Sequence, residues 1–568
     1  MKEILNNKVI KYALFYLGAL LLCLLSIWPY LNNGYIMAYR GGGGDDIVFH
    51  IPNLLALAEK IKMLDFTPIY WFLGNGNSPI TPLFYPQLFT LPAAALIAMS
   101  IPAIIAWKIY IFMVTFVTFL VTYFVAKKFF HKPIFAWICG ILYIFAIYRI
   151  GNIYNRAAIG EVLSCMILPL FLYAIYEILY NKKHGKWYLI PLVFFAVLNA
   201  HMVSAFFCAI LLAIYLIARA PKIIKNKKLL ISLSLAFLFC VLVSLSMTIP
   251  QFEQRLIQKF VSPAPWTIMS EMAVKLTNAF QNTIEGRADN WSIGIAFCFV
   301  PLFALMFFRK EENKTRRKFF LHTLIALAIF AFFSIDHFFD LKTIGAFYDL
   351  FQFPFRLFII VTLLACFVLT YNIKQFCEWV KFGQIVSFII VALLLVNSFN
   401  VVYQQKDRYL GKKDNGWFWT RTNFTPTEVI CTDYYPKDFK TRADFYPKNV
   451  KEADGETEYN TKFNGKQFSV EYNGGNDIAL IAPAVYYKGY SAKFIADNGK
   501  KTKLQTHRTG DAKLAIHGTK ADGTGKIVIK YAGTFWQHFS NIITWLSVAF
   551  LIIVGHRYRR RERQNEIH

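Results

Sequence analysis

The chain has 568 residues, of which 56% are hydrophobic and 17% aromatic, and its formal net charge at pH 7 is +27. This composition excludes an ordinary soluble protein, because several apolar runs approach the roughly 20 residues that cross a bilayer as a helix. The positive charge does not indicate nucleic acid, since much of it lies in short loops between apolar runs, where membrane topology accounts for it. The sequence therefore predicts a polytopic α-helical membrane protein.

The cysteines give no sign of a disulfide framework or a metal centre. Nine cysteines are spread along the chain, and only Cys431 falls within the large polar segment at residues 403–537. No Cys-x-x-Cys pair indicates zinc. We predict no metal site and no cofactor, while a requirement for a divalent metal stays open.

The N-terminal segment carries lysines ahead of a long apolar run from Val9 to Leu31. The run has no small-residue cleavage site and further apolar runs follow it, so we predict an uncleaved first helix with a cytoplasmic N-terminus. A long outer loop, residues 32–102, is expected after it.

The outer loop contains four consecutive glycines, Gly41–Gly44, followed by Asp45, Asp46 and His50. Glycines let the backbone turn sharply or approach a ligand closely. An amphipathic helix is expected from Ile51 to Met63. Acids at the mouth of a membrane span indicate chemistry at the membrane surface, and a flexible solvated loop is the alternative.

Basic clusters then mark the cytoplasmic loops of about twelve crossings, with both termini inside. The apolar run at 88–101 is expected to re-enter or lie at the interface, because otherwise Lys127 and Lys128 would face outward. A second long outer loop is expected at 250–292. The remaining predicted spans lie near 103–126, 134–149, 161–180, two short runs meeting at Asn199-Ala200-His201, 229–249, 293–308, 318–335, 357–373, 384–402 and 538–555.

The segment 403–537 differs in composition from the rest of the chain. Alternating stretches such as Gln467–Tyr472 and Lys526–Tyr531, separated by Gly-rich turns, indicate β-strands. We predict an extracytoplasmic β-sandwich between a transmembrane domain at 1–402 and a terminal anchor with a basic tail at 538–568.

Four motifs combine charge with a defined frame where predicted helices enter or leave the outer leaflet. Their placement predicts that they converge on one cavity there. The motifs are Asp45/Asp46/His50, Tyr154 to Glu161 including Arg156, Pro250 to Glu253, and Gln352 to Arg356.

In this order of motifs the chain resembles the bacterial YfhO-like membrane proteins. The closing β domain with its Tyr487-Lys488-Gly489-Tyr490 turn and the terminal anchor fit as well. These proteins are similar to the wider GT-C glycosyltransferases, which use polyprenyl-phosphate-linked sugars on the outer face of the membrane. The resemblance covers nearly the whole chain. Phe355 and Gly160 depart from it, at positions where Trp and Ala are common.

The resemblance implies a GT-C-like fold and an inverting transfer of a sugar from a polyprenyl-phosphate donor to an envelope glycopolymer, such as teichoic or lipoteichoic acid. It places the catalytic acid at Asp45 or Asp46. It also implies a multi-pass protein of a bacterial cell membrane, with membrane lipid, donor and acceptor as its partners and no nucleic acid.

The residues of these motifs include the chemical groups that such a reaction needs. Glycosyl transfer needs a general base near the acceptor hydroxyl, which Asp45 or Asp46 can supply. It also needs cations for the leaving phosphate, and Arg156 and Arg356 offer planar forks of donors.

We predict that His50, Glu161 and Glu253 also bind substrate. Other roles stay open at this stage. The less favoured alternative for Arg356 is an interfacial anchor, and Glu161 and Glu253 fit structural acids at helix ends about as well. His201 fits a hydrogen-bonded polar residue of a helix hairpin better than a catalyst.

Two other functions compete with glycosyl transfer. Twelve spans suit a transporter or lipid-carrier flippase, but such folds show repeated halves and broken helices near the midplane, and no internal repeat is present. A scaffold that presents its β domain would leave the acids at the span mouths unexplained.

Overall fold

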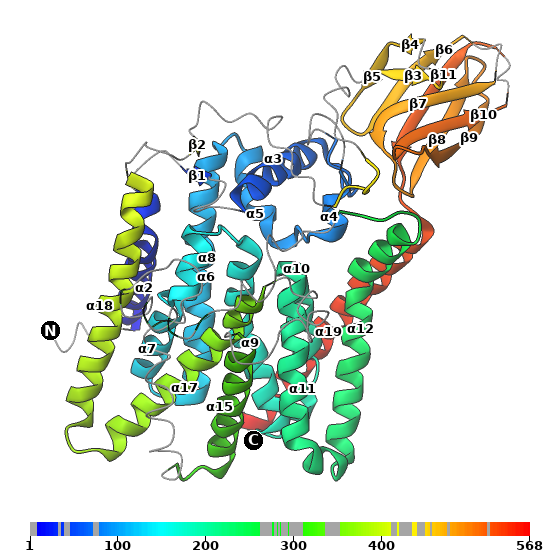
Figure 1. Cartoon of the computed structure of the whole chain (residues 1–568). Helices are drawn as coiled ribbons and strands as arrows, with labels where there is room; N and C mark the ends of the chain where they lie inside the picture. The colour runs from blue at the N-terminus through cyan, green and yellow to red at the C-terminus, as the bar shows by residue number, and fades with distance from the viewer. Residues whose placement is uncertain are drawn as a thin grey trace.

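The computed structural model describes residues 8–31, 36–38, 46–71, 79–261, 311–334, 353–410, 417–419, 434–439, 449–454, 457–473, 477–519 and 523–567, with the single positions 275, 277, 281, 285 and 294. Helices stand side by side in a bundle, and a β domain lies at one end of it (Figure 1). The prediction of a polytopic helical membrane protein with a C-terminal β domain is confirmed.

In the described part of the chain, nine helices are long and apolar enough to cross a membrane. The bent pair α7 (Pro133–Ile144) and α8 (Ile147–Tyr154) makes a tenth span if counted as one. The total of twelve stays a prediction, because the expected span at 293–308 lies outside the described residues. The nine are α2 (Lys8–Leu31), α6 (Ala103–Phe130), α9 (Ile159–Leu179), α11 (Met202–Ile224), α12 (Lys227–Arg255), α15 (Lys314–Ser334), α17 (Phe358–Trp379), α18 (Gly383–Leu410) and α19 (Phe535–Ile567).

The expected span at 134–149 is broken by a bend of 41° between α7 and α8. The fully buried Arg149 accounts for the stability of this break. Its guanidinium donates to the Ile144 carbonyl at 3.0 Å, at the end of α7, and to Thr115 Oγ1 of α6 at 2.8 Å. The Ile144 carbonyl at the break thus accepts a hydrogen bond from a charged donor, and a buried polar group requires such a partner.

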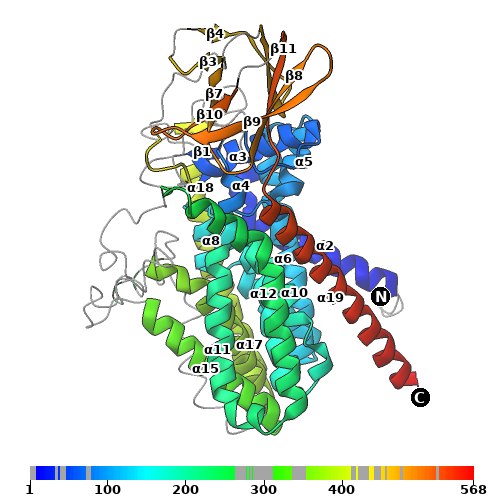
Figure 2. The ribbon, with the colours of Figure 1, turned by 90° about the vertical axis from the view of Figure 1, so that its right-hand side faces the viewer.

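Short elements form a layer between the spans and the β domain. They are α3 (Ile47–Met63), α4 (Thr81–Phe84), the 3₁₀ turn η1 (Leu88–Thr90) and α5 (Leu91–Ala98). Figure 2 shows this layer beneath the β domain in the turned view. Because α5 has only 8 residues, it cannot cross a bilayer, and the segment 88–101 lies at the end of the bundle instead. Helix α3 begins four residues before the expected Ile51, which brings Asp46 to its N-cap.

The hairpin expected at Asn199-Ala200-His201 is formed by α10 (Leu189–Ala200) and α11, with His201 in an extended conformation between them. Its two arms differ in length, because α10 has 12 residues and α11 has 23. Only the second arm is long enough to span alone.

The β domain is one antiparallel sheet of nine strands in the order β4-β3-β7-β10-β9-β8-β11-β6-β5. Residues 501–504 of β9 pair with β8 and residues 505–508 pair with β10, so the sheet folds over at β9. The predicted strands at 467–472 and 526–531 are the neighbours β6 and β11. The strands are β3 (Val450–Glu452), β4 (Glu458–Tyr459), β5 (Thr461–Phe463), β6 (Gln467–Tyr472), β7 (Ile478–Val485), β8 (Tyr490–Ala496), β9 (Lys501–Arg508), β10 (Lys513–Gly518) and β11 (Gly525–Tyr531).

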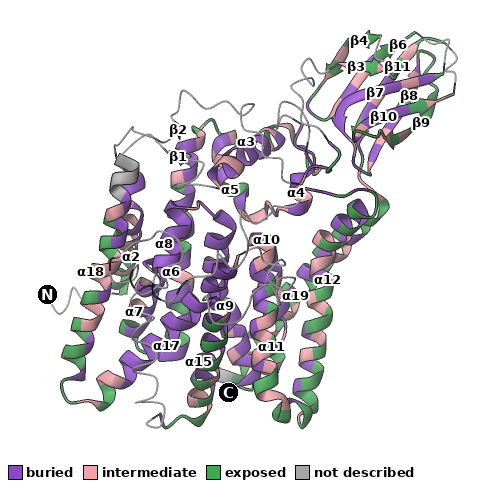
Figure 3. Ribbon diagram, viewed as in Figure 1, coloured by how far each residue is buried: buried purple, intermediate pink, exposed green. Residues whose placement is uncertain are grey.

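The first outer loop packs into the core of the β domain. Trp71 is 1% exposed, and its ring lies 5.4 Å from Phe468 and 6.1 Å from Tyr490 between centroids. Burial of an aromatic side chain of this kind stabilises a contact by about 1.5–3 kcal/mol. The same loop also pairs with the segment that follows α18, since β1 (Ile36–Ala38) runs antiparallel to β2 (Trp417–Trp419) in a separate two-stranded sheet. Figure 3 shows the buried residues concentrated in the bundle interior and between the layers.

Candidate functional site

A buried carboxylate organises the polar cluster at the end of the bundle nearest the β domain. Glu161, in the first turn of α9, is 2% exposed. Its Oε2 accepts from Tyr148 Oη at 2.5 Å and from Asn152 Nδ2 at 3.1 Å. Its Oε1 lies 2.8 Å from Arg156 Nη1 and 3.2 Å from Arg356 Nε. One acid therefore orients two guanidinium groups from distant segments.

A tight turn between α8 and α9 brings Arg156 back onto Glu161. Ala157 has a φ of 54°, in the left-handed region, which costs a non-glycine residue roughly 1–2 kcal/mol. The backbone N–H of Arg156 donates to the Gly151 carbonyl at 3.1 Å, and its guanidinium donates to Asn152 Oδ1 at 2.9 Å. Strain held in place by such contacts is found mainly at functional sites.

Asp46 joins the cluster as its partly exposed acid. Its backbone N–H donates to the Arg156 carbonyl at 2.8 Å, and its Oδ2 lies 3.9 Å from Arg156 Nη2. The Asp46 side chain is 42% exposed, against 2% for that of Glu161. Asp46 is thus the more accessible of these two acids. Asp45 lies outside the described residues.

Arg356 lies in the 3₁₀ turn η6 (Pro354–Leu357) that precedes α17. Its side chain is 11% exposed, and its guanidinium lies 5.0 Å from the centre of the Phe353 ring. Arg156 lies 5.0 Å from the centre of the Phe355 ring in the same way. Each cation therefore rests on an aromatic face. An interfacial anchor would point to the headgroups, so the inward direction of Arg356 favours the site role.

His50 is buried beside the cluster. Its ring stacks at 6.1 Å on Trp107 and lies 5.5 Å from Tyr85. Burial, with a smaller contribution from the neighbouring His201, lowers the pKa of His50 to about 3. The imidazole is therefore neutral at pH 7, and His50 adds no positive charge to the cluster.

Sequence reasoning missed Tyr85 as a site residue and gave His201 only a structural role. A Cβ added at Gly160 would lie 2.7 Å from Tyr85 Oη and 3.0 Å from His201 Cδ2, so both side chains pack directly on the start of α9. His201 Nδ1 lies 2.9 Å from Ser204 Oγ, as expected for a hairpin residue. The close approach also explains why glycine stands at position 160.

The charge state of Arg156 is fixed by its neighbours. Burial alone disfavours a charged guanidinium, but the adjacent Glu161 and Asp46 carboxylates outweigh it and raise the pKa of Arg156. The pKa of Tyr85 is also raised, first by burial and then by Asp46, so its hydroxyl stays protonated. The cluster thus combines an exposed carboxylate, permanent cations and a phenolic donor.

The structure does not bring Glu253 to this cluster. Its Oε2 accepts from Thr534 Oγ1 at 2.5 Å, and its Oε1 lies 3.1 Å from Lys488 Nζ. Glu253 therefore joins α12 to the β domain and to the start of α19. Gln251 of the same motif does reach the outer layer, where it donates to the Leu83 carbonyl at 2.7 Å.

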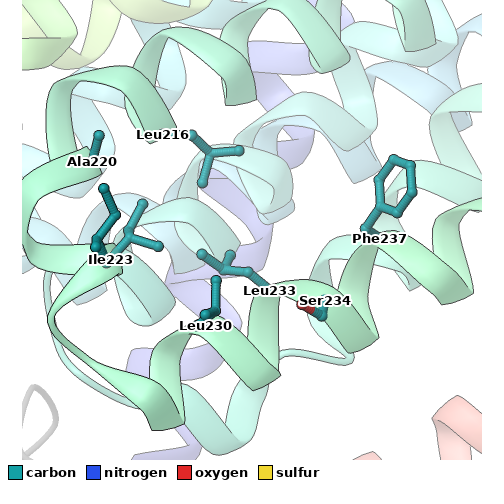
Figure 4. A pocket seen from close by; sticks show the side chains of 8 residues that line it. Leu216, Ala220, Ile223, Leu230, Leu233, Ser234 and Phe237 are labelled. Atoms are coloured by element: carbon teal, nitrogen blue, oxygen red, sulfur yellow. The ribbon is translucent and has the colours of Figure 1, made fainter.

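A groove of about 400 Å³ between α11 and α12 is separate from the site (Figure 4). Its lining is almost wholly apolar, which suits lipid chains rather than a polar reaction. In the described part of the chain, no group of three or more His, Cys, Asp or Glu residues has the arrangement of a metal site. The lining residues are Leu216, Ala220, Ile223, Ile224, Leu230, Leu233, Ser234 and Phe237.

The fold and this cluster define a polytopic membrane protein with a charged site at one end of its bundle. The model of a membrane protein family described as 6-pyruvoyl-tetrahydropterin synthase related domain matches residues 84–403. This match covers more than half of the chain, and the chain belongs to that family.

No curated protein matches the chain. A similar solved structure is the cryo-EM structure of the arabinofuranosyltransferase AftD from Mycobacteria, with 13% identity and a TM-score of 0.45. The similarity covers 69% of this chain and 26% of that chain. The chain therefore spans about a quarter of AftD, and similarity at this level decides neither activity nor substrate. The resemblance to YfhO-like proteins stays a prediction.

Proposed function

We propose that this protein is an integral-membrane glycosyltransferase that moves a sugar from a polyprenyl-phosphate donor to a cell-envelope acceptor. The observation that carries the proposal is the position of Asp46, a partly exposed carboxylate held beside Arg156, Arg356 and Glu161 at the mouth of the bundle. The predicted resemblance to YfhO-like and GT-C proteins supports the same chemistry.

The site is proposed to face outward. Basic loops meet at the end of the bundle opposite the β domain, where Lys183 lies 2.5 Å from Glu562 and Lys132 lies 3.2 Å from Glu378. Excess Lys and Arg in short loops favours the cytoplasmic side. Both termini are then cytoplasmic, and the β domain and the cluster lie outside a bacterial cell membrane.

Each group has a defined part in the proposed reaction. Asp46 accepts the proton of the acceptor hydroxyl, while the oxygen of that hydroxyl bonds to the anomeric carbon. The bond from that carbon to the donor phosphate breaks on the opposite face, and the phosphate leaves with the bonding electrons. Arg156 and Arg356 stabilise the charge on the leaving phosphate. Glu161 positions both guanidinium groups.

A direct test uses the purified full-length protein in nanodiscs with labelled polyprenyl-phosphate sugars and an envelope glycopolymer extract. Transfer of label to the polymer is the expected result. A parallel assay in sealed vesicles measures the side on which intact donor resides. Donor that crosses the membrane unchanged, with no sugar released, would instead establish the alternative of a lipid-carrier flippase.

A further inference from the structure

A second charged region lies on the β domain, away from the cluster around Glu161. The strand register places six exposed lysines on the outer side of the sheet formed by β9, β8, β11, β6 and β5. We call this surface the lysine face. Its lysines are Lys462, Lys493, Lys501, Lys503, Lys526 and Lys530.

The lysines follow the period of the strands. Lys493 of β8 lies directly opposite Lys503 of β9 and, on its other side, opposite Val528 of β11. Lys526 and Lys530 flank Val528 on β11, and Lys501 precedes Lys503 by two residues. Residues two apart on a strand point to the same side, so all these ammonium groups project outward.

Among the described residues, acidic side chains do not balance the positive charge of the lysine face. Glu471, opposite Lys526, is the acid that the register places on this face, and it pairs with Lys462 at 3.1 Å. Elsewhere in the domain, Lys451 lies 3.8 Å from Glu458 and Lys513 lies 2.9 Å from Asp511. The lysine face thus has one ion pair for its six lysines among the described residues.

Protection of sheet edges accounts for only part of the arrangement. Lys462 lies on the edge strand β5, and Lys501 and Lys503 lie in the half of β9 that pairs with β8 alone. The other three lysines lie on β8 and β11, which are paired on both sides, so edge protection gives no reason for them. Like charges directly opposite each other, as in Lys493 and Lys503, also destabilise a sheet. Because the protein keeps this pair despite its cost in stability, we infer that the surface binds a ligand that neutralises the charge.

The spacing indicates the class of ligand. The backbone positions of Lys501 and Lys503 lie roughly 6–7 Å apart along β9, those of Lys526 and Lys530 about 13 Å apart along β11, and those of Lys493 and Lys503 about 5 Å apart between strands. Lysines on flexible stems form no fixed pocket for one ion, but they follow a chain of repeated anions well. We propose that the lysine face binds a linear polyanion of the cell envelope, with repeated phosphate or carboxylate groups. Its role as acceptor rests on the proposed function, but the binding itself does not.

The β domain is attached to the end of the helix bundle that carries the candidate site. Besides the ion pair of Lys488 with Glu253, Gln254 of α12 donates to the Lys488 carbonyl at 2.7 Å and accepts from its backbone N–H at 3.1 Å. Trp71 anchors the outer layer into the domain core. A polyanion bound on the lysine face is therefore held on the domain that adjoins the cluster around Glu161.

The test measures binding of labelled linear inorganic polyphosphate to the full-length protein in nanodiscs of neutral lipid, at low and high salt. The double variant Lys493→Gln/Lys503→Gln should weaken binding about tenfold, and salt should reduce the remaining affinity. The control variant Lys451→Gln/Lys513→Gln removes the same charge elsewhere in the domain and should change affinity less than about twofold.

Further measurements separate this result from misfolding and from general attraction. The variant Lys503→Glu creates an opposite-charge pair with Lys493, so it should keep the unfolding temperature and still lose polyphosphate binding. Equal losses in the face and control variants would overturn the proposal. Binding of anionic lipid vesicles in preference to polyphosphate would overturn it too. Because no sugar is transferred in these assays, their outcome is independent of the glycosyltransferase assignment.

Discussion

The two ends of α9 each bury an acid, but they do so in different ways. We call the end of α9 away from the β domain its inner end and the end nearer that domain its outer end. At the inner end Glu177 is 4% exposed and lies 2.6 Å from Lys186, while Asn181 donates to it at 2.8 Å. At the outer end Glu161 is held by two arginines, a tyrosine and an asparagine. Both carboxylates are satisfied, as buried charges must be.

The difference lies in where the partners come from. The partners at the inner end, Asn181 and Lys186, both follow shortly after Glu177 in the sequence. The outer cluster gathers Asp46, Arg156 and Arg356 from three distant segments and keeps one acid accessible. A helix end needs only local partners for stability. Long-range convergence on a reachable carboxylate is the pattern of a site.

The largest difference should appear when the two acids are neutralised. Glu161→Gln leaves two buried guanidinium groups without their shared partner, and loss of a buried charge partner costs about 3–5 kcal/mol. Glu177→Gln should cost less, because Lys186 also lies 3.9 Å from Glu562. Thermal unfolding of both variants in detergent checks this order. Equal destabilisation would remove the energetic distinction between the two ends.

Cations at the two ends should differ in their effect on the donor. Arg356→Ala removes a candidate phosphate contact, and hydrogen bonds to charged groups contribute about 1.5–3 kcal/mol, or roughly 10- to 150-fold in affinity. Lys186→Ala should leave donor affinity unchanged. Titration of a labelled polyprenyl-phosphate sugar into each variant measures both. Unaltered affinity in Arg356→Ala would argue for a purely structural arginine.

Glycines at the two ends offer a smaller perturbation. A methyl group at Gly160 meets Tyr85, His201 and the Ala200 carbonyl, and overpacking of this kind costs about 1–3 kcal/mol. At Gly185 the added methyl meets the side chain of Tyr558 on α19. We expect Gly160→Ala to lower sugar transfer and Gly185→Ala to spare it. Transfer assays at matched protein concentration measure both variants. A larger loss of transfer in Gly185→Ala than in Gly160→Ala would contradict this expectation.

His50 predicts a modest dependence of stability on pH. Its pKa is lowered to about 3 by burial and then by His201, so the folded protein binds fewer protons than the unfolded chain below pH 6.5. The stability that comes from the neutral buried ring is present above pH 6.5 and is lost as pH falls toward 3. Unfolding temperatures at pH 7 and pH 5 should therefore differ more in the wild type than in His50→Gln. An equal difference in both proteins would contradict this assignment.

Much of the fold was predictable because apolar runs and basic loops are local signals. The strand patterns at 467–472 and 526–531 were visible for the same reason. The bend between α7 and α8 was not, since it depends on Arg149 reaching Thr115 of another helix. Nor was the packing of Trp71 into the β domain, which joins segments far apart in the chain.

The site was predictable where charge and position coincided. Asp46, Arg156, Glu161 and Arg356 stand at helix ends, and the structure joins them. Glu253 carries the same signal but faces Lys488, because charge at a helix end does not tell which neighbour the side chain meets. Tyr85 lies in an aromatic, proline-rich stretch with no distinguishing pattern, so only the fold places it against Gly160.

The central claim is that the outer cluster reacts through Asp46. Turnover of labelled donor by Asp46→Asn, beside Glu59→Gln, tests it most directly, because Glu59 is an acid of the same helix with the same 42% side-chain exposure. Loss of a general base should lower turnover about 10²- to 10⁴-fold in Asp46→Asn, with donor affinity retained and Glu59→Gln unaffected. Near-wild-type turnover in Asp46→Asn would contradict the account.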